Sequence, residues 1–408
     1  MNVKKARSLS RITKIINNRF FRMVLANPLN LLYILIWNIK MLILKINGNK
    51  TINFNVQFDY FYNVFQPIYE ELLSDKHIKI YFSWSCTNNT LKDFLKDKIE
   101  KNKLISNQIS PFIYFDVFIT AEINGPDFPL SFFPTRKIEL YHGTGIHAQY
   151  EKREILSRFD IHFAIGPRYI PFILSLPYTR FLGDNLRKIG YPKLDTLFTP
   201  DPDFDGKLIE LYGLKDKFVI LYTPHWNLLG SLHILGLKMI EKLAAIDKDV
   251  VILFKVHNYL FTKFKEQNWY KKLDDLQKNY SNIRIVTRPN TQEIFFLGDM
   301  MITDTATTVA LEFSITRKPL FVFYSLEWFE NKTNVQVEHD IIDVAITFKT
   351  IDEITRFTRE VKDKNPDMMK VLESQRERQD ILINNNLFNP GTATKIACQV
   401  IRKELRMQ

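Results

Sequence analysis

Residues 218–227, FVILYTPHWN, decide the fold class of this 408-residue chain. Six apolar, aromatic or β-branched residues are followed directly by a turn that contains proline, histidine and tryptophan. Such a run is typical of a parallel strand that is buried on both faces. The same pattern returns in VVILFKVH at 250–257 and in MMITDTATT at 300–308. These stretches predict an α/β fold in which polar residues follow the strand ends.

Nine runs of this kind predict strands, and amphipathic stretches lie between most of them. The predicted strands are 78–84, 113–120, 137–142, 161–165, 218–223, 250–256, 283–287, 300–303 and 319–324. The predicted helices are 90–103, 149–158, 207–213, 234–246, 262–279, 291–297, 306–316 and 352–363. Buried strands that alternate with helices are expected to form parallel sheets in α/β layers.

The length of the chain predicts two domains, since single cores stop growing near roughly 250–300 residues. Pro200 and Pro202, with Asp201 and Asp203 beside them, break any regular element and mark the best boundary. We therefore expect two doubly wound, Rossmann-like domains that face a cleft, followed by C-terminal helices. The predicted division is 1–50, 51–200, 201–370 and 371–408.

The positive charge of the chain is concentrated near its N-terminus. The formal net charge is +11, but residues 1–50 carry ten basic side chains and no acidic ones, which leaves +1 for residues 51–408. A protein that coats nucleic acid would spread its charge over a folded face, so no nucleic-acid partner is expected. The pattern predicts a local contact with an anionic surface.

The first 50 residues read as two helical segments. Residues 3–23 place apolar and basic side chains on different faces, which is typical of a helix that lies in a membrane interface. Residues 29–46 contain 14 apolar residues of 18, almost enough to span a bilayer. Asn38 and Lys40 are costly near a membrane centre, so a half-immersed or protein-packed helix is expected. A core helix of the first domain is the alternative.

The chain has only two cysteines, Cys86 and Cys398, which form neither a disulfide framework nor a zinc site. A reducing compartment is therefore the default. Together with the basic segment, this predicts a peripheral protein at the cytoplasmic face of the cell membrane. No carboxylate or histidine cluster has metal-ligand spacing, so no cofactor is expected beyond the Mg²⁺ that a diphosphate donor can bring.

Four predicted strand ends carry residues that are capable of chemistry. They are Tyr141-His142-Gly143-Thr144-Gly145, Thr223-Pro224-His225-Trp226-Asn227, Lys255-Val256-His257-Asn258 and Asp304-Thr305-Ala306-Thr307-Thr308. Ligands bind beyond the carboxyl ends of strands in such sheets, and these ends come from both predicted domains. His142 and His257 can act as acid, base or phosphate-stabilising groups near neutral pH. The threonine-rich turn can bind phosphate at a helix start, although N-capping alone would also explain its threonines.

These segments also resemble, in order, the motifs of a known family. Tyr141-His142-Gly143-Thr144 is similar to W-H-G-T, Ile189–Asp195 to G-Y-P-R-x-D, Ile220–Trp226 to I-L-Y-A-P-T-W/F-R, and Phe254–His257 to K-x-H-P. Met301–Thr308, with Arg317-Lys318-Pro319 and Phe323-Tyr324, resembles L-I-T-D-Y-S-S…K-R-P…F-Y, and Gly391-Thr392-Ala393 resembles a late Gly-small-small segment. Over about residues 137–400 the chain thus looks like the CDP-glycerol glycerophosphotransferases, which build teichoic-acid-type and capsular polyol-phosphate polymers.

The resemblance implies a GT-B-like fold with the nucleotide mainly on the C-terminal domain. It implies that His142 is the general base toward the acceptor hydroxyl and that His257 stabilises the transferred or leaving phosphate. The donor- and phosphate-binding residues are then Asp304, Thr305, Thr307, Thr308, Lys255 and Glu312. The acceptor loop is Gly143, Thr144 and Gly145, and further cleft residues are Pro224, Trp226 and Asp195.

Several positions depart from the family's motifs. Asn227 stands in place of the arginine after the aromatic residue, and Asn258 in place of the proline after the second histidine. The usual Pro-Leu-Lys is replaced by Gly145-Ile146-His147, and the acids after Phe323-Tyr324 are reduced to Glu327. His147 and Arg153 are candidates for replacing the lost cations.

The sequence therefore predicts an enzyme that transfers a polyol phosphate, such as glycerol phosphate, from a CDP-activated donor. The expected acceptor is a membrane- or lipid-linked glycan or polymer, in cell-wall or capsular polymer synthesis. One alternative is a GT-B glycosyltransferase that uses a nucleotide sugar. The other is a non-catalytic, membrane-associated scaffold on the same fold.

Overall fold

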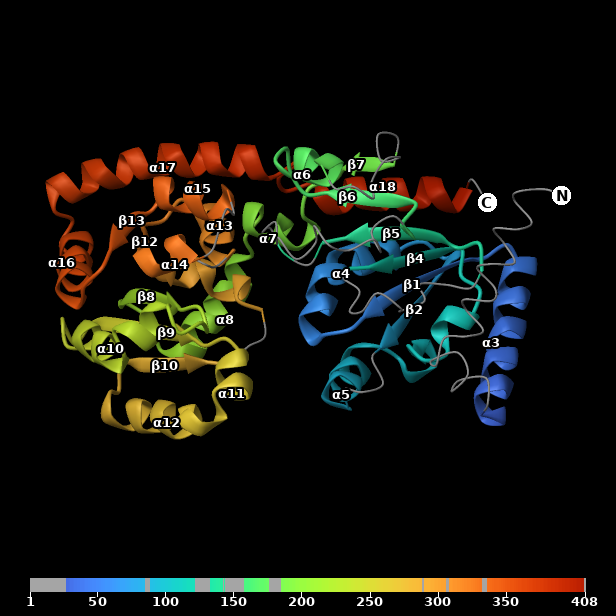
Figure 1. The fold of residues 1–408 in the computed structure, drawn as a ribbon, viewed down its shortest axis with the longest axis horizontal. Coiled ribbons are helices and arrows are strands. Elements are labelled where there is room, and N and C mark those ends of the chain that lie inside the picture. The colour runs from blue at the N-terminus through green and yellow to red at the C-terminus, as the bar shows by residue number, and fades with distance from the viewer. Residues whose placement is uncertain are drawn as a thin grey trace.

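The computed structural model describes residues 27–84, 89–121, 133–141, 143, 158–175, 185–287, 290–305, 308–331 and 336–406. It contains two sheets in separate lobes, and all of their paired strands are parallel (Figure 1). The first sheet has the order β3-β2-β1-β4-β5-β6-β7 and the second β10-β9-β8-β11-β12-β13. Each order reverses direction once, so both sheets are doubly wound. The predicted fold class is confirmed.

The strands are short and mostly buried. Those of the first sheet are β1 Lys50–Val56, β2 Ile78–Trp84, β3 Leu104–Ser106, β4 Val117–Thr120, β5 Arg136–Leu140, β6 Ile161–Ala164 and β7 Leu186–Lys188. Those of the second are β8 Phe218–Thr223, β9 Val250–Lys255, β10 Ile283–Val286, β11 Met300–Asp304, β12 Leu320–Phe323 and β13 Ile346–Phe348. The runs at β8 and β9 are continuous because helices cover both faces of a parallel sheet.

Helices fill the connections between the strands. In the first domain they are α3 Pro28–Ile46, α4 Asp59–Leu72, α5 Asn89–Lys98, α6 Tyr169–Ser175 and α7 Asp195–Phe198, with 3₁₀ turns η1 Lys101–Lys103, η2 Ser110–Phe112 and η5 Pro192–Leu194. In the second they are α8 Pro202–Tyr212, α9 Ser231–Ile234, α10 Leu237–Ala244, α11 Tyr259–Lys263, α12 Trp269–Asn279, α13 Val309–Ser314, α14 Leu326–Asn331, α15 Gln336–Val344 and α16 Ile351–Lys362, with η6 Lys265–Gln267 and η7 Gln292–Leu297. The chain closes with α17 Pro366–Asn386 and α18 Ala393–Arg406. The predicted helices 3–23 and 149–158 lie outside the described residues, except for residue 158.

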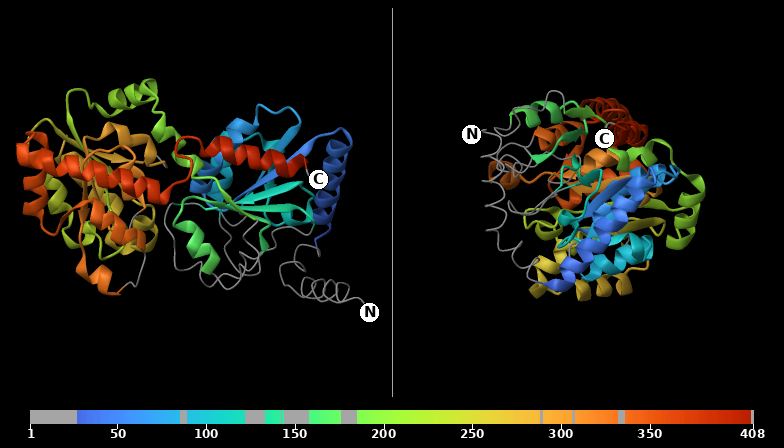
Figure 2. Two further views of the ribbon diagram at one scale, coloured as in Figure 1. Left: turned by 90° about the horizontal axis from the view of Figure 1, so that it is seen from above. Right: turned by 90° about the vertical axis from the view of Figure 1, so that its right-hand side faces the viewer.

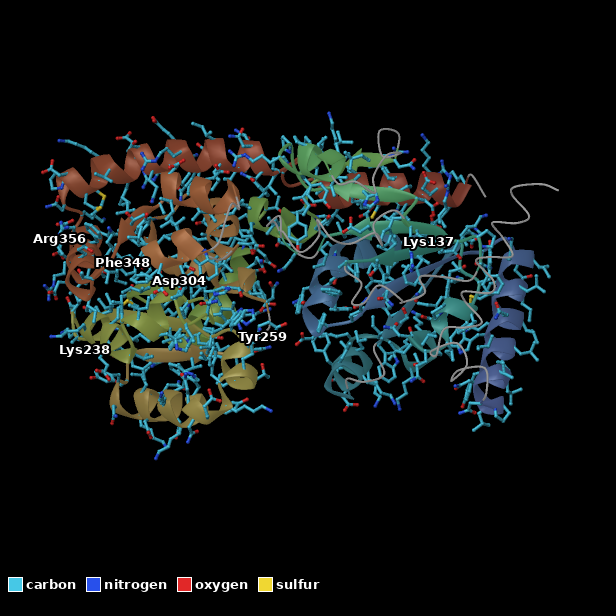
Figure 3. All side chains as sticks on the ribbon, viewed as in Figure 1. Lys137, Lys238, Tyr259, Asp304, Phe348 and Arg356 are labelled. Atoms are coloured by element: carbon cyan, nitrogen blue, oxygen red, sulfur yellow. The ribbon has the colours of Figure 1, made fainter. Side chains whose placement is uncertain are left out.

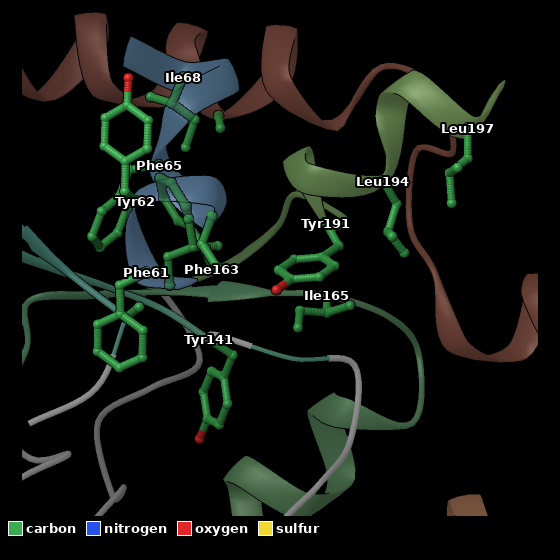
Figure 4. Packing of buried hydrophobic residues seen from close by; sticks show 14 of the residues in the cluster. Phe61, Tyr62, Phe65, Ile68, Tyr141, Phe163, Ile165, Tyr191, Leu194 and Leu197 are labelled. Atoms are coloured by element: carbon green, nitrogen blue, oxygen red, sulfur yellow. The ribbon is translucent and has the colours of Figure 1, made fainter. Parts of the chain in front are cut away.

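Strand β1 and helix α4 were not predicted, although β1 is near the centre of the first sheet. One face of β1 is polar yet buried: the side-chain amides of Asn53 and Asn55 donate to Ser83 Oγ at 2.9 and 3.0 Å. These partners satisfy groups that would otherwise be costly inside a core. The opposite face is apolar, and Phe54 packs on Phe65 of α4 with ring centroids 5.1 Å apart. Figure 4 shows Phe65 in this core.

The C-terminal helices join the two lobes. Figure 2 shows α17 along the second domain and α18 continuing along the first. The carboxylate of Asp195 accepts hydrogen bonds from the backbone nitrogens of Ala393 and Thr394 at 3.1 and 2.7 Å, and so caps the start of α18. The G-Y-P-x-x-D and Gly-small-small segments of the sequence therefore meet in space and fix the return of the chain.

Gly190 is required by this crossing, and we expect its replacement by alanine to destabilise the protein. Its φ is +94°, and an added Cβ would lie 2.1 Å from the carbonyl oxygen of Phe388. Strain of this kind costs on the order of 1–3 kcal/mol or more in the free energy of unfolding. Gly206→Ala is the matched control, because nothing lies within 4 Å of its added Cβ and it should stabilise α8 by about 0.5–1 kcal/mol. Urea denaturation measures the free energy of unfolding of both variants. Equal changes in this free energy for Gly190→Ala and Gly206→Ala would contradict the account.

Helix α3 is docked on the first domain by its polar residues. Asn38 donates its amide to the Phe112 carbonyl oxygen at 2.8 Å and accepts from the Tyr114 nitrogen at 3.0 Å. Lys45 Nζ donates to the Tyr114 hydroxyl at 3.0 Å. The helix is long and apolar enough to cross a membrane, but its polar interruptions face the protein. Its other face exposes Leu29, Leu31, Leu32, Leu35, Ile36, Ile39, Leu42, Ile43 and Ile46.

Candidate functional site

The candidate site lies where the order of the second sheet reverses, between β8 and β11. Strands β8 and β11 are neighbours in the sheet. The chain continues from β8 to β9 on one side and from β11 to β12 on the other side. A topological switch point of this kind leaves a crevice beyond the carboxyl ends of the strands. The segment 224–231 follows β8 and Asp304 ends β11, so the structure brings two of the predicted strand ends together.

Asp304 holds the 224–231 loop in place. Its carboxylate accepts the backbone N–H of His225 at 2.6 Å and that of Ser231 at 2.9 Å. The side chain is buried, and burial raises the pKa of Asp304 to about 6 although these hydrogen bonds act in the opposite direction. Gly230 passes so close that an added Cβ would lie 2.8 Å from Asp304 Oδ2. Asp304 was predicted to bind the donor, and in the structure its carboxylate anchors this loop.

Local hydrogen bonds stabilise the 224–231 loop, which carries Trp226. His225 Nδ1 accepts the Asn227 N–H at 3.1 Å, and Asn227 Oδ1 accepts the Leu229 N–H at 2.9 Å. Pro224, at the start of the loop, is buried, whereas Trp226 is half-buried. The Trp226 ring packs against Tyr259 of α11 with centroids 5.4 Å apart.

His257 follows β9 and is held as a defined tautomer. Its Nδ1 accepts the Tyr259 N–H at 3.1 Å, so in the neutral ring the proton is on Nε2, which is a donor. The side chain keeps contact with solvent, yet neighbouring protein atoms displace much of its water, and Lys255 and Lys263 add positive charge. These effects lower the pKa of His257 to about 4. The imidazole is therefore neutral at pH 7 and offers one N–H to a ligand.

Cations and aromatic rings gather beside His257. Lys263 Nζ lies 3.9 Å from the ring centroid of Trp226 and 4.5 Å from that of Tyr259. Burial lowers the pKa of Lys255, while Asp59 at the start of α4 in the first domain acts to raise it. Figure 3 shows Tyr259 at the edge of the second lobe that faces the first. Tyr259 and Lys263 were missed in the sequence, where only their i, i+4 spacing after His257 could have pointed to them.

Glu312 is buried on α13, away from solvent. The side-chain amide of Gln292 donates to its carboxylate, and burial raises the pKa of Glu312 while the charge of Lys193 acts to lower it. Lys193 belongs to η5 of the first domain, so this predicted phosphate ligand has partners within the protein. Thr308 is half-buried and precedes α13, and Thr305 is buried.

Other predicted site residues lie outside the described part of the chain. These are His142, Thr144, Gly145 and Thr307, together with the compensating candidates His147 and Arg153. Gly143 is described, and an added Cβ would meet nothing within 4 Å. Within the described ranges, no group of three or more His, Cys, Asp or Glu side chains comes together to hold a metal ion.

Solved structures share the architecture of this chain. The wall teichoic acid polymerase TagF matches with a TM-score of 0.65 and 18% identity over 89% of this chain and 91% of that chain. A putative UDP-N-acetylglucosamine 2-epimerase from Listeria monocytogenes matches with a TM-score of 0.58 and 11% identity over 88% and 98%. A co-structure of S. aureus MnaA with UDP gives 0.57 and 14% over 88% and 98%. Identities this low establish a shared fold, which is GT-B-like.

Sequence comparison gives a more specific result. No curated protein matches the chain. The family described as CDP-Glycerol:Poly(glycerophosphate) glycerophosphotransferase matches residues 179–379, which include β8 to β13 and the loops around His257 and Asp304. This is the family that the ordered motifs resemble, and its members are transferases. Residues 179–379 of this chain therefore match the CDP-glycerol:poly(glycerophosphate) glycerophosphotransferase family.

Proposed function

We propose that this protein transfers glycerol phosphate from CDP-glycerol to a growing polyol-phosphate polymer of the teichoic-acid type. The family match over 179–379 is the observation that carries the proposal. The fold shared with the wall teichoic acid polymerase TagF over nearly the whole chain agrees with it. The acceptor is proposed to be a lipid-linked glycan or polymer at the cytoplasmic face of the membrane.

The reaction joins the acceptor oxygen to the β-phosphorus of the donor. The bond from that phosphorus to the bridging oxygen breaks, CMP leaves with this oxygen, and the acceptor proton passes to a base. His142 is proposed as that base, on the resemblance to the family alone. His257 is proposed to donate Nε2–H to a phosphate oxygen, where a positioned donor stabilises charge that develops in the transition state.

A nucleotide panel tests the donor class directly. A ligand that binds only the folded state raises the thermal midpoint, so the full-length chain should be stabilised by CDP-glycerol and CDP. UDP and GDP at the same concentration should give smaller shifts. If UDP or GDP stabilised the protein more than CDP, the glycosyltransferase alternative would replace the proposal.

The exposed face of α3 is proposed to hold the protein at the membrane. Its polar face is occupied by hydrogen bonds to the rest of the first domain, while nine large aliphatic residues on its other face are exposed. A helix in this setting can lie in the interfacial layer with its apolar face in the lipid. Residues 1–50 carry ten cations and no acidic residue, which favours an anionic bilayer.

Charge placed on this face should release the protein from membranes. Leu35 and Leu42 are 57% and 56% exposed and lie two turns apart on one side of α3. The double variant Leu35→Glu, Leu42→Glu should bind anionic vesicles at least about tenfold more weakly, because each buried leucine contributes about 1.5–3 kcal/mol. Cosedimentation with phosphatidylglycerol vesicles measures the effect. Leu211→Glu, at a 64% exposed position on α8, is the control, and equal binding of all three proteins would refute the membrane role of α3.

A further inference from the structure

Lys263 places a positive charge beside His257, the predicted catalytic histidine. Lys263 lies on α11, which none of the family's motifs includes. It is the last residue of α11, and its ammonium lies over the rings of Trp226 and Tyr259 at 3.9 and 4.5 Å. The Tyr259 ring is in turn 5.0 Å from the His257 ring, centroid to centroid. The ammonium and the His257 N–H therefore belong to one cluster at the end of β9.

The positive charge of this cluster has no close counter-ion. Among the residues that the structure describes, no carboxylate lies within 4 Å of the ammonium nitrogens of Lys255 or Lys263. Asp59 acts on Lys255 only from the first domain, and both lysines act to lower the pKa of His257. An anion that accepts the His257 N–H would therefore lie in the field of two positive charges, which favours its binding.

The cluster also accounts for a departure in the sequence. The arginine that follows the aromatic residue in the family's motif is Asn227 here, and its side chain is used to cap the 224–231 loop at Leu229. Lys263 brings a cation to the same Trp226 ring from α11. A cation can thus be present at this place in space although the motif position has lost it.

We propose that Lys263 is a phosphate-binding residue of this site, and that with Lys255 and His257 Nε2–H it holds the diphosphate of the nucleotide donor. The identity of the donor rests on the proposed function, whereas the binding of a diphosphate group does not. Lys263 sits on the aromatic pair, which positions its flexible side chain before the ligand arrives and so reduces the entropy that binding costs.

Binding of pyrophosphate, CDP and cytidine to Lys263→Gln tests the proposal. Loss of one charged hydrogen bond should weaken the binding of CDP and inorganic pyrophosphate about 10- to 100-fold, as measured by isothermal titration calorimetry of the full-length chain. Cytidine, which has no phosphate, should be unaffected, and Lys263→Arg should keep most of the affinity. Lys265→Gln removes an exposed cation two residues away and should change nothing.

The change in the His257 pKa on binding pyrophosphate is a second readout. A lysine with only a structural role would not affect this change. In the wild type, pyrophosphate should raise the His257 imidazole pKa observed by NMR, and this response should shrink in Lys263→Gln. Unchanged pyrophosphate and CDP affinities in Lys263→Gln would overturn the inference, whatever happens to thermal stability. If the wild type binds pyrophosphate through Lys263 but not CDP, the inference stands and the proposed donor fails. If it binds neither, both are overturned.

Discussion

Replacing His257 with alanine should lower the rate of CMP release from CDP-glycerol about 100- to 1,000-fold, which is typical for the loss of one positioned donor at a developing charge. The structure fixes the donor as Nε2–H, because the Tyr259 N–H occupies Nδ1. His257→Gln can place an amide N–H near the position of Nε2 and should retain part of the activity. His257→Asn reaches only the position of Nδ1 and should behave like alanine.

The pH dependence of this variant separates a neutral donor from a charged one. Displacement of water by neighbouring protein atoms, together with the charges of Lys255 and Lys263, lowers the pKa of His257 to about 4, so the imidazole is neutral throughout pH 6–9. The ratio of wild-type to His257→Ala rates should therefore be constant over this range. A ratio that falls as pH rises from 6 to 8 would show that the protonated ring is the active form. His77→Ala, at an exposed position before β2, is the control for loss of a histidine.

Replacing Asp304 with alanine should lower the free energy of unfolding by about 2–5 kcal/mol, because two backbone N–H groups lose their acceptor. One of them, on Ser231, is buried, and the other precedes Trp226 in the 224–231 loop. Activity should fall as well, since this loop positions the aromatic pair beside His257. Asp274→Ala removes an exposed ion pair with Lys278 and should change stability by less than about 1 kcal/mol in urea denaturation.

The pH dependence of stability gives an independent test of Asp304. Its pKa is raised from 3.8 to about 6 in the folded state, so its contribution to stability is fully present below pH 4 and is lost as the pH rises through 6. The free energy of unfolding of wild type minus that of Asp304→Asn should therefore decrease by about 3 kcal/mol between pH 4 and pH 7. A difference that increases with pH would mean that the folded protein favours the ionised carboxylate.

The strands that the sequence predicted most accurately are buried on both faces. Strands β8 and β9 are covered on both faces, so their apolar runs predict them to within one residue. Strand β1 has one apolar and one buried polar face, and the hydrogen bonds from Asn53 and Asn55 to Ser83 that make it stable are long-range. Strands β3, β7 and β13 have only three residues each, which is too short for a periodic signal.

The sequence predicted those residues of the candidate site that lie directly at the end of a strand. His257, Trp226 and Asp304 were predicted for this reason, and the last two are brought to the same switch point by the neighbouring strands β8 and β11. The hydrogen bonds of Asp195 to the start of α18 join residues about 200 positions apart, and nothing local in the sequence indicates them. Lys263 likewise reaches Trp226 only because α11 folds back over the loop after β8.

The central claim is that the chain moves glycerol phosphate from a CDP donor, and product analysis tests it most directly. The full-length protein would be incubated with CDP-glycerol and a lipid-linked poly(glycerol phosphate) primer, and CMP and phosphodiester would be followed by ³¹P NMR. We expect one CMP for each new glycerol phosphate unit on the primer, and loss of both signals in His257→Ala. If CDP-glycerol stayed intact while a UDP- or GDP-sugar was consumed with the same acceptor, the account would be contradicted.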